Sequence, residues 1–388
     1  MACLMSSDTV AMGKSIWETA RGLGSMLMSG YFCIRACYNA FMRPLNFKSD
    51  NEAPAHPKVL EALTQANQGF ASAYATDELS DALHQAFARY FGTEVHVLPL
   101  ATGTAANSII LGELCPPWGS IWCHTQAHIH NDEGTAPEFY THGAKLAPLP
   151  GDNGKLDPHR LDHAITRAGA HGVHNAKPSL VSITQATECG TSYRPDEIHA
   201  LSEVARSHGL PLHMDGARFS NAVMHLQCHP GDVTWQAGVD VLAYGGSKNG
   251  GLCAEAIVVF GHPEWLEGLE RRRKRGGHLL SKMRYVSAQL LALLEQDLAH
   301  DIAAQANGLA QRLAQGIEAS SRASLQWPVE ANEVFMKAPP KVLDWLKQQG
   351  CQFHIWPGFD DVGRLVCSHE TDPTEIDRFI QLLSEAPD

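Results

Sequence analysis

The sequence predicts a three-layer α/β domain built on a mainly parallel sheet, followed by a smaller α+β domain. The 388 residues are 44% hydrophobic and 19% charged, enough for one large core and a second, smaller one. A helical pattern with a terminal glycine at 195–209 separates two apolar runs of strand length, as in a βαβ unit. Buried parallel strands require helices on both faces of the sheet. The four apolar runs are SLVSITQ at 179–185, LPLHMD at 210–215, VDVLAY at 239–244 and AEAIVVF at 254–260.

The elements change in character after residue 262. A basic helical stretch at 264–285 leads into a long helix, and a shorter α+β segment begins near residue 322. We therefore expect a large domain over 45–290, whose first part, 45–65, is an N-terminal arm. A small C-terminal domain is expected over 291–388.

Residues 1–44 differ from the rest of the chain. Arg35 interrupts their apolar stretch, which is too short for a membrane span of about 20 residues. The segment meets the pattern of a secretory signal only loosely, and Asp8 and Glu18 argue against a transit peptide. We expect a poorly ordered or non-native extension, with initiation at Met42 as one explanation; a targeting segment and a docking helix are the alternatives.

Composition argues against two classes of partner. The formal net charge of −12 repels nucleic acid and anionic membrane surfaces.

The ten cysteines follow no repeated framework, which favours reduced thiols and a cytoplasmic location.

Polar residues at strand ends suggest a cofactor site. Asp215 and Arg218 follow one predicted strand and Lys248 follows the next, so the three can meet at one edge of the sheet. Gly103 and Thr104 begin an apolar helix, whose first N–H groups can bind phosphate. A phosphate cup, an aspartate for the pyridine nitrogen and a lysine as covalent anchor are what pyridoxal 5'-phosphate requires.

Each of these features alone has an ordinary structural explanation, such as a simple helix start, a capping aspartate or a solvated lysine. Their combination and order favour the cofactor site. A nucleotide-binding loop is the alternative, but a Walker motif needs glycine directly before the lysine, where Ser247 stands.

Seven segments follow one another along the chain: SDNEAP, TGTAAN, TQAHIHNDEGTAPEF, ITQATECGTSYRPDEI, HMDGARFSNAV, GGSKNG and GRLVCS. In this order they resemble the low-specificity L-threonine aldolases, fold-type I pyridoxal phosphate enzymes, particularly the bacterial branch that also cleaves phenylserine. The resemblance begins near residue 46 and implies an aspartate aminotransferase-like fold. The sequence departs from the commoner pattern in two places: Asn249-Gly250 follow the lysine, and Gln185 stands in place of a glutamate.

The resemblance also implies roles for individual residues. Lys248 would anchor the cofactor, Asp215 would hold its pyridine nitrogen, and Arg218 would lie beside its phenolic oxygen or the substrate. His128 would stack on the ring and take part in proton transfer. Ser49 and Arg364 would bind the substrate carboxylate.

The resemblance further implies a homo-oligomer, a dimer of dimers, with active sites shared between subunits. Lys282 or Arg284 would reach the neighbour's phosphate, although a solvated basic helix explains them equally well. His124 and His130 could suggest zinc, but without matching acidic or cysteine ligands we expect structural histidines and no metal.

The expected reaction is the cleavage of L-β-hydroxy-α-amino acids, such as threonine, allo-threonine and phenylserine, to glycine and an aldehyde. A β-eliminating lyase and an aminotransferase are the closest alternatives, because one fold supports several outcomes. The sequence does not decide between a methyl and a phenyl β-substituent, nor the threo or erythro preference.

Overall fold

The computed structural model describes residues 44–387. The chain divides into two units, Met1–Leu45 and Asn46–Asp388, and both domain sheets belong to the second. The predicted N-terminal extension lies outside the described residues except for Pro44.

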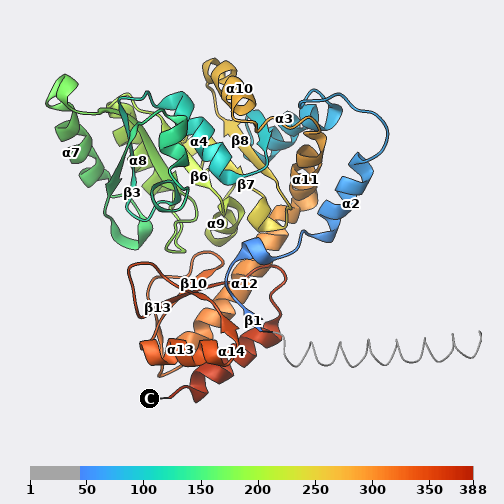
Figure 1. Cartoon of the computed structure of the whole chain (residues 1–388), viewed down its shortest axis with the longest axis vertical. Helices are drawn as coiled ribbons and strands as arrows, with labels where there is room; N and C mark the ends of the chain where they lie inside the picture. Colours follow the sequence, from blue (N-terminus) through green and yellow to red (C-terminus); the bar gives the residue numbers. More distant parts are fainter. Residues whose placement is uncertain (1–43, 388) are drawn as a thin grey trace, which may run out of the picture. The chain divides into compact units, whose positions relative to one another are not determined.

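A seven-stranded sheet forms the centre of the large domain (Figure 1). Its strand order is β2-β8-β7-β6-β5-β3-β4. Only β8 runs antiparallel to its neighbours β2 and β7, so the sheet is mainly parallel, as predicted. The strands are β2 (His96–Leu100), β3 (Gly119–His124), β4 (Lys145–Leu149), β5 (Lys177–Thr184), β6 (Leu212–Gly216), β7 (Val241–Gly245) and β8 (Glu255–Val259).

Helices cover both faces of this sheet, because alternate strand residues point to opposite sides. On β8, Ala256 and Val258 join the core that α3, α7, α8 and α11 cover. Ile257 and Val259 face the other way and pack with residues of α4 and α10. The three-layer prediction is therefore confirmed.

The second sheet is antiparallel and has four strands in the order β12-β13-β10-β9. Figure 1 shows β10 and β13 near α13 and α14, with the long helix α12 running from the large domain into the small one. The strands are β9 (Ser324–Leu325), β10 (Glu333–Lys337), β12 (His354–Ile355) and β13 (Val362–Val366). Short strands β1 (Leu45–Asn46) and β11 (Cys351–Gln352) complete the set. The domain boundaries at residues 44 and 290 stay predictions.

The helices begin and end at recognisable signals. Thr102 caps α4 by accepting a hydrogen bond from Ala105 N, and Pro195 occupies the first turn of α8. The helices are α2 (Pro57–Ala66), α3 (Glu78–Phe91), α4 (Gly103–Leu114), α5 (His128–Asn131), α6 (Ala136–Tyr140), α7 (Pro158–Gly169), α8 (Pro195–Ser207), α9 (Phe219–Leu226), α10 (Leu266–Arg275), α11 (Arg284–Leu294), α12 (Leu298–Glu318), α13 (Pro340–Gln348) and α14 (Pro373–Glu385).

Two details differ from the sequence expectation. The run 254–260 forms β8 and returns antiparallel after a tight turn, since only a single 3-10 turn, Ser247–Asn249, and no crossover α-helix separates it from β7. The basic stretch 264–285 is not one helix, because α10 ends at Arg275 before Gly276 and Gly277. Within the described residues, no helix combines the length and the apolar character needed to span a membrane.

Candidate active site

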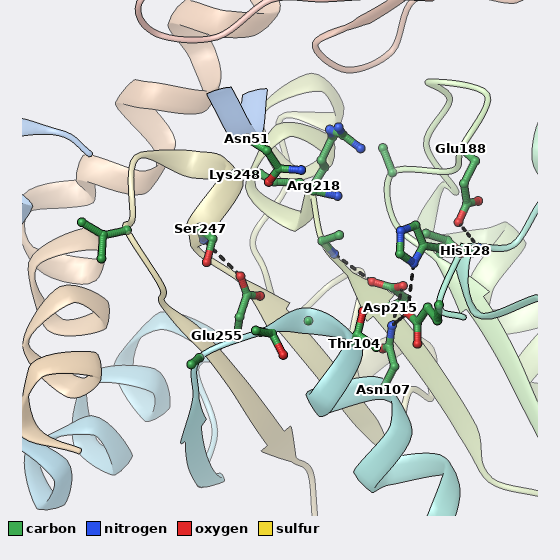
Figure 2. A pocket seen from close by; sticks show the side chains of 18 residues that line it. Asn51, Thr104, Asn107, His128, Glu188, Asp215, Arg218, Ser247, Lys248 and Glu255 are labelled. Carbon is green, nitrogen blue, oxygen red and sulfur yellow. Dashed lines mark hydrogen bonds and ion pairs between the residues drawn. The ribbon is translucent and has the colours of Figure 1, made fainter. Parts of the chain in front are cut away.

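Lys248 lies in the tight turn between β7 and β8, at the edge of the sheet where β6 also ends (Figure 2). Gly250 ends the turn with φ of +87°, a conformation that glycine adopts without strain. The Asn249 side chain donates to Ala299 O at 2.8 Å, and Gly250 O accepts from His56 N at 2.8 Å. The Asn249-Gly250 pair therefore fixes the turn that presents Lys248.

The environment of Lys248 favours a reactive amine. Burial is the largest influence and lowers the pKa of Lys248, and the Arg218 guanidinium lowers it further. The carboxylates that oppose this shift are those of Asp50, Asp215 and Glu333. A lowered pKa increases the share of neutral, nucleophilic amine near neutral pH.

Asp215 is buried at the end of β6, and each of its oxygens accepts a hydrogen bond. Ala217 N donates to Oδ1 at 3.1 Å and Asn107 Nδ2 donates to Oδ2 at 2.8 Å. Asn107 also donates to Glu133 Oε1 at 2.8 Å. One amide thus fixes the orientation of two carboxylates in the pocket.

The N-terminus of α4 forms another wall of the pocket. Gly103 and Thr104 are its first two residues, so their N–H groups have no intrahelical acceptor. Together with the helix dipole, these groups can bind an anion.

His128 begins the short helix α5 and extends toward Asp215 (Figure 2). Its Nδ1 lies 3.0 Å from Glu133 Oε1, and its backbone N–H donates to Glu188 Oε1 at 2.6 Å. Burial would lower the pKa of His128, but the hydrogen bond to Glu133 and the charge of Asp215 raise it above its ordinary value.

Arg218 and Arg364 both form ion pairs with buried carboxylates. Arg218 donates to both oxygens of Asp50, at 2.8 and 2.9 Å, and its Nη1 lies 3.3 Å from Glu333 Oε2. Arg364 donates from Nε and Nη2 to Glu333 Oε1, at 2.9 and 2.7 Å. Asn332 donates a further hydrogen bond to Asp50 Oδ2 at 3.0 Å.

A cavity of about 340 Å³, within the range of small-molecule sites, lies between the β6, β7 and α4 ends described above. Six predicted residues lie on its wall, whereas Ser49 and Arg364 do not. The Ser49 side chain instead accepts from Asn51 N as a helix cap, and Arg364 is hydrogen-bonded to Glu333, which does not line the cavity either. The six are Gly103, Thr104, His128, Asp215, Arg218 and Lys248.

Two further acids of the wall have strongly raised pKa values. Burial and the nearby Asp215 charge raise the pKa of Glu188 to about 7. Burial also raises the pKa of Glu255 to about 7, although Ser247 and Lys248 oppose the shift.

The histidines considered for zinc are separate from this group. His124 Nε2 is 3.0 Å from Gly151 O and its Nδ1 accepts from Gln126 N, which is a structural arrangement. His130 is exposed on α5. The structure instead places His128, Glu133 and Asp215 with ligand atoms within 4.8 Å of one another. The expectation of no metal stays a prediction.

The basic residues considered for a neighbouring site lie before and at the start of α11. Lys282 is exposed, and Arg284 is half-buried with its guanidinium 5.0 Å from the centre of the Tyr285 ring. Which of them would reach a neighbour stays open.

Several site residues were missed in the sequence. Asp50 lies within the quoted segment SDNEAP and Glu255 within AEAIVVF, but neither was singled out. Glu333, in the apolar strand β10, was also missed. A lone acid in a buried apolar run is the signal that could have identified Glu255 and Glu333, because such an acid needs a partner.

The fold matches that of a known enzyme class. The solved structure of Leishmania major threonine aldolase has a TM-score of 0.80 to this chain at 26% identity, covering 87% of this chain and 98% of that one. The architecture is that of the fold-type I pyridoxal phosphate enzymes.

Sequence comparison gives the family. The family model for beta-eliminating lyases matches residues 46–339. The low specificity L-threonine aldolase of Pseudomonas sp. (strain NCIMB 10558) is 39% identical over 330 residues, covering 85% of this chain and 94% of that protein. The enzyme of the same name from Pseudomonas aeruginosa is 40% identical over 327 residues, covering 84% and 93%. The chain belongs to the beta-eliminating lyase family and, within it, to the group of the low specificity L-threonine aldolases.

Proposed function

We propose that this protein binds pyridoxal 5'-phosphate and cleaves L-β-hydroxy-α-amino acids to glycine and an aldehyde. The observation that carries the proposal is the convergence of Lys248, Asp215 and the α4 N-terminus on one cavity. The names of the similar proteins point to the same reaction.

The residues of the cavity suit this cofactor. Lys248 supplies the amine that binds the aldehyde carbon, and Asp215 supplies a carboxylate for the pyridine nitrogen. The N–H groups of Gly103 and Thr104 supply donors for the phosphate. When bound, the cofactor provides an electron sink for the pair released as the Cα–Cβ bond breaks.

His128 is the proposed proton acceptor for the β-hydroxyl group. Its Nδ1–H donates to Glu133 in the neutral ring, which leaves Nε2 with a free lone pair. Loss of the hydroxyl proton allows the oxygen to become the carbonyl of the departing aldehyde, and a proton returned to Cα completes glycine.

Arg218 and Arg364 are the proposed carboxylate-binding residues, with Ser49 as a third candidate. Arg218 is on the cavity wall, whereas Arg364 is not and is hydrogen-bonded to Glu333. A fixed carboxylate would orient the substrate so that the bond to be broken is aligned with the ring.

Product analysis tests the proposal. The protein is incubated with pyridoxal phosphate and, separately, L-threonine, L-allo-threonine or DL-threo-phenylserine, and glycine and aldehyde are measured directly. We expect both products in equal amounts. Ammonia and a keto acid would identify an eliminase, and a keto acid formed only with an added amino acceptor would identify an aminotransferase.

We also propose a cytoplasmic homo-oligomer, a dimer of dimers with shared active sites. Two segments, 70–74 and 280–281, lie side by side, since Tyr74 N donates a hydrogen bond to Ser281 O. Both expose large apolar side chains, namely Phe70, Tyr74 and Leu280, which suit a subunit interface. The seven described free cysteines suit a reducing compartment. Light scattering after gel filtration should give the mass of a tetramer, and cell fractionation tests the location.

A further inference from the structure

Glu255 lies beside the site where a phosphate would bind. It is the first residue of β8 and is 7% exposed, opposite Gly245 of β7 and Leu100 of β2. Its Oε2 is 3.8 Å from the position that a Cβ on Gly103 would occupy, and Ser247 N donates to its Oε1 at 3.3 Å. Figure 2 shows the Glu255 side chain near the α4 N-terminus, on the opposite side of the pocket from Glu188.

An ionised Glu255 would conflict with a phosphate group at this helix end. Two anions that share a small, partly dry site repel each other, so one of them must take a proton. A protonated carboxyl group has an O–H that can donate to a phosphate oxygen, and such charge-assisted bonds are strong. Neutral carboxylic acids serve as donors in other buried sites.

We propose that Glu255 enters the cofactor complex as a neutral carboxylic acid and donates a hydrogen bond to the phosphate group. This inference rests on the proposed function, because it assumes that the phosphate of the cofactor binds at Gly103 and Thr104. Glu255 is then a cofactor-binding residue, and its protonation makes phosphate binding depend on pH.

The surroundings of Glu255 support a proton near neutral pH. Burial raises the pKa of Glu255 to about 7, and the Asp215 charge adds to this effect. Lys248 and the Ser247 hydrogen bonds oppose it. The facing residues of β2, β7 and α4 are Leu100, Gly245 and Gly103, so these three positions carry no ionisable side chain.

The direction of the pH dependence follows from linkage. A bound phosphate favours the protonated form and raises the pKa of Glu255 above its value in the free protein. Above pH 7 the phosphate ester, whose own second pKa is about 6, is a dianion, so binding weakens as pH rises above 7 because Glu255 must then take up a proton. For a single proton the weakening is at most about tenfold per pH unit.

Titrations with two ligands separate the contribution of the phosphate to binding from that of the rest of the cofactor. The cofactor-free protein is titrated with pyridoxal 5'-phosphate and with pyridoxal, which lacks the phosphate, between pH 7 and 8.5, with absorbance as the readout. Because Lys248 binds both aldehydes, the ratio of the two affinities isolates the phosphate. In the unmodified protein we expect the ratio of the pyridoxal phosphate affinity to the pyridoxal affinity to fall as pH rises above 7. In Glu255→Gln the ratio should stay nearly level, and at pH 8.5 it should be about tenfold higher than in the unmodified protein.

Glu188→Gln is the matched control, since it removes another acid of raised pKa from the opposite side of the pocket. It should keep the pH dependence of the ratio. The proposal is overturned if the affinity ratio of Glu255→Gln shows the same pH dependence as that of the unmodified protein. It is also overturned if Glu255→Gln lowers the ratio at every pH. If the unmodified protein binds neither aldehyde, the proposed function fails instead.

Calorimetry on the unmodified protein gives a second measurement that needs no variant. Titrations at pH 8 in two buffers of different ionisation enthalpy report the protons taken up on binding. Pyridoxal phosphate should take up nearly one proton more than pyridoxal. Equal uptake would overturn the proposal, even if Glu255→Gln failed to fold.

Discussion

Arg364 donates two hydrogen bonds to a single oxygen of Glu333, at 2.9 and 2.7 Å, from the neighbouring strand of the small sheet. Glu333 is 1% exposed, and its other oxygen lies 3.3 Å from Arg218 Nη1. One buried carboxylate thus orients both guanidinium groups that we propose for substrate binding. The order of charges, from Asp50 through Arg218 and Glu333 to Arg364, leaves each buried group beside a partner of opposite sign.

Glu333→Gln should destabilise the protein and weaken substrate binding. Removing one member of a buried ion pair costs about 3–5 kcal/mol, and Arg364 loses the group that orients it. Urea unfolding should give a lower free energy of unfolding for Glu333→Gln than for the unmodified protein. In steady-state kinetics with L-threonine, KM should rise by a larger factor than kcat falls. Glu318→Gln, at an exposed position on α12, is the control. A lower KM in Glu333→Gln would instead mean that Glu333 competes with the substrate carboxylate.

Lys248→Ala should abolish the covalent attachment of the cofactor while the fold persists. Lys248 is the lysine on the described cavity wall, and its lowered pKa favours the reactive amine. After reduction with borohydride, mass spectrometry should find pyridoxal phosphate on the unmodified protein and on the exposed control Lys58→Ala, but not on Lys248→Ala. Attachment that persisted in the variant would identify another lysine as the anchor.

The strand-end residues could be predicted because their positions depend on local pattern. The apolar runs at 210–215 and 239–244 placed Asp215 and Lys248 at strand ends, and parallel strands end at the same edge of a sheet. The partners could not be predicted in this way. Asp50 and Arg218 are 168 residues apart, and no local pattern links them.

The partner of Arg364 could not be predicted from the local sequence either. The resemblance assigned it to the substrate, and nothing in its own segment indicated Glu333, which lies on a different strand. Pairing of β10 with β13 brings the two side chains together, and this register follows from the packing of the whole small domain.

Asp50 should make stability depend on pH in the acid range. Burial raises its pKa, but Arg218, Lys248 and Asn332 lower it more, to about 2 from an ordinary 3.8. Its contribution is therefore fully present above pH 3.8 and is lost as pH falls toward 2. Asp50→Asn should be less stable at pH 7, and its free energy of unfolding should change less between pH 4 and 2. Urea unfolding at several pH values measures the free energy of unfolding of both proteins. If it changed with pH by the same amount in Asp50→Asn and in the unmodified protein, the prediction would be contradicted.

Glu133→Gln should shift the pH profile of the reaction. His128 must be neutral to accept a proton, and the hydrogen bond to Glu133 raises the pKa of His128. The rate of the unmodified enzyme should therefore rise with pH through a value above the ordinary 6.5 of histidine. Without the carboxylate charge, the acidic limb of kcat/KM should move to lower pH. An unmoved limb would mean that another group limits the rate there.

Arg364→Ala and His128→Ala should affect different steps. Arg364→Ala removes a guanidinium group suited to clamp a carboxylate with two hydrogen bonds, so KM should rise. Its kcat should also fall, because the bond to be broken is no longer aligned. His128→Ala should mainly lower kcat, by about a hundredfold or more if His128 acts as the general base, while glycine still perturbs the cofactor spectrum. The exposed residues Arg378 and His130 provide matched alanine controls. Steady-state kinetics with L-threonine and phenylserine separates the two effects, and a His128→Ala variant with normal kcat would show that the proton leaves by another route.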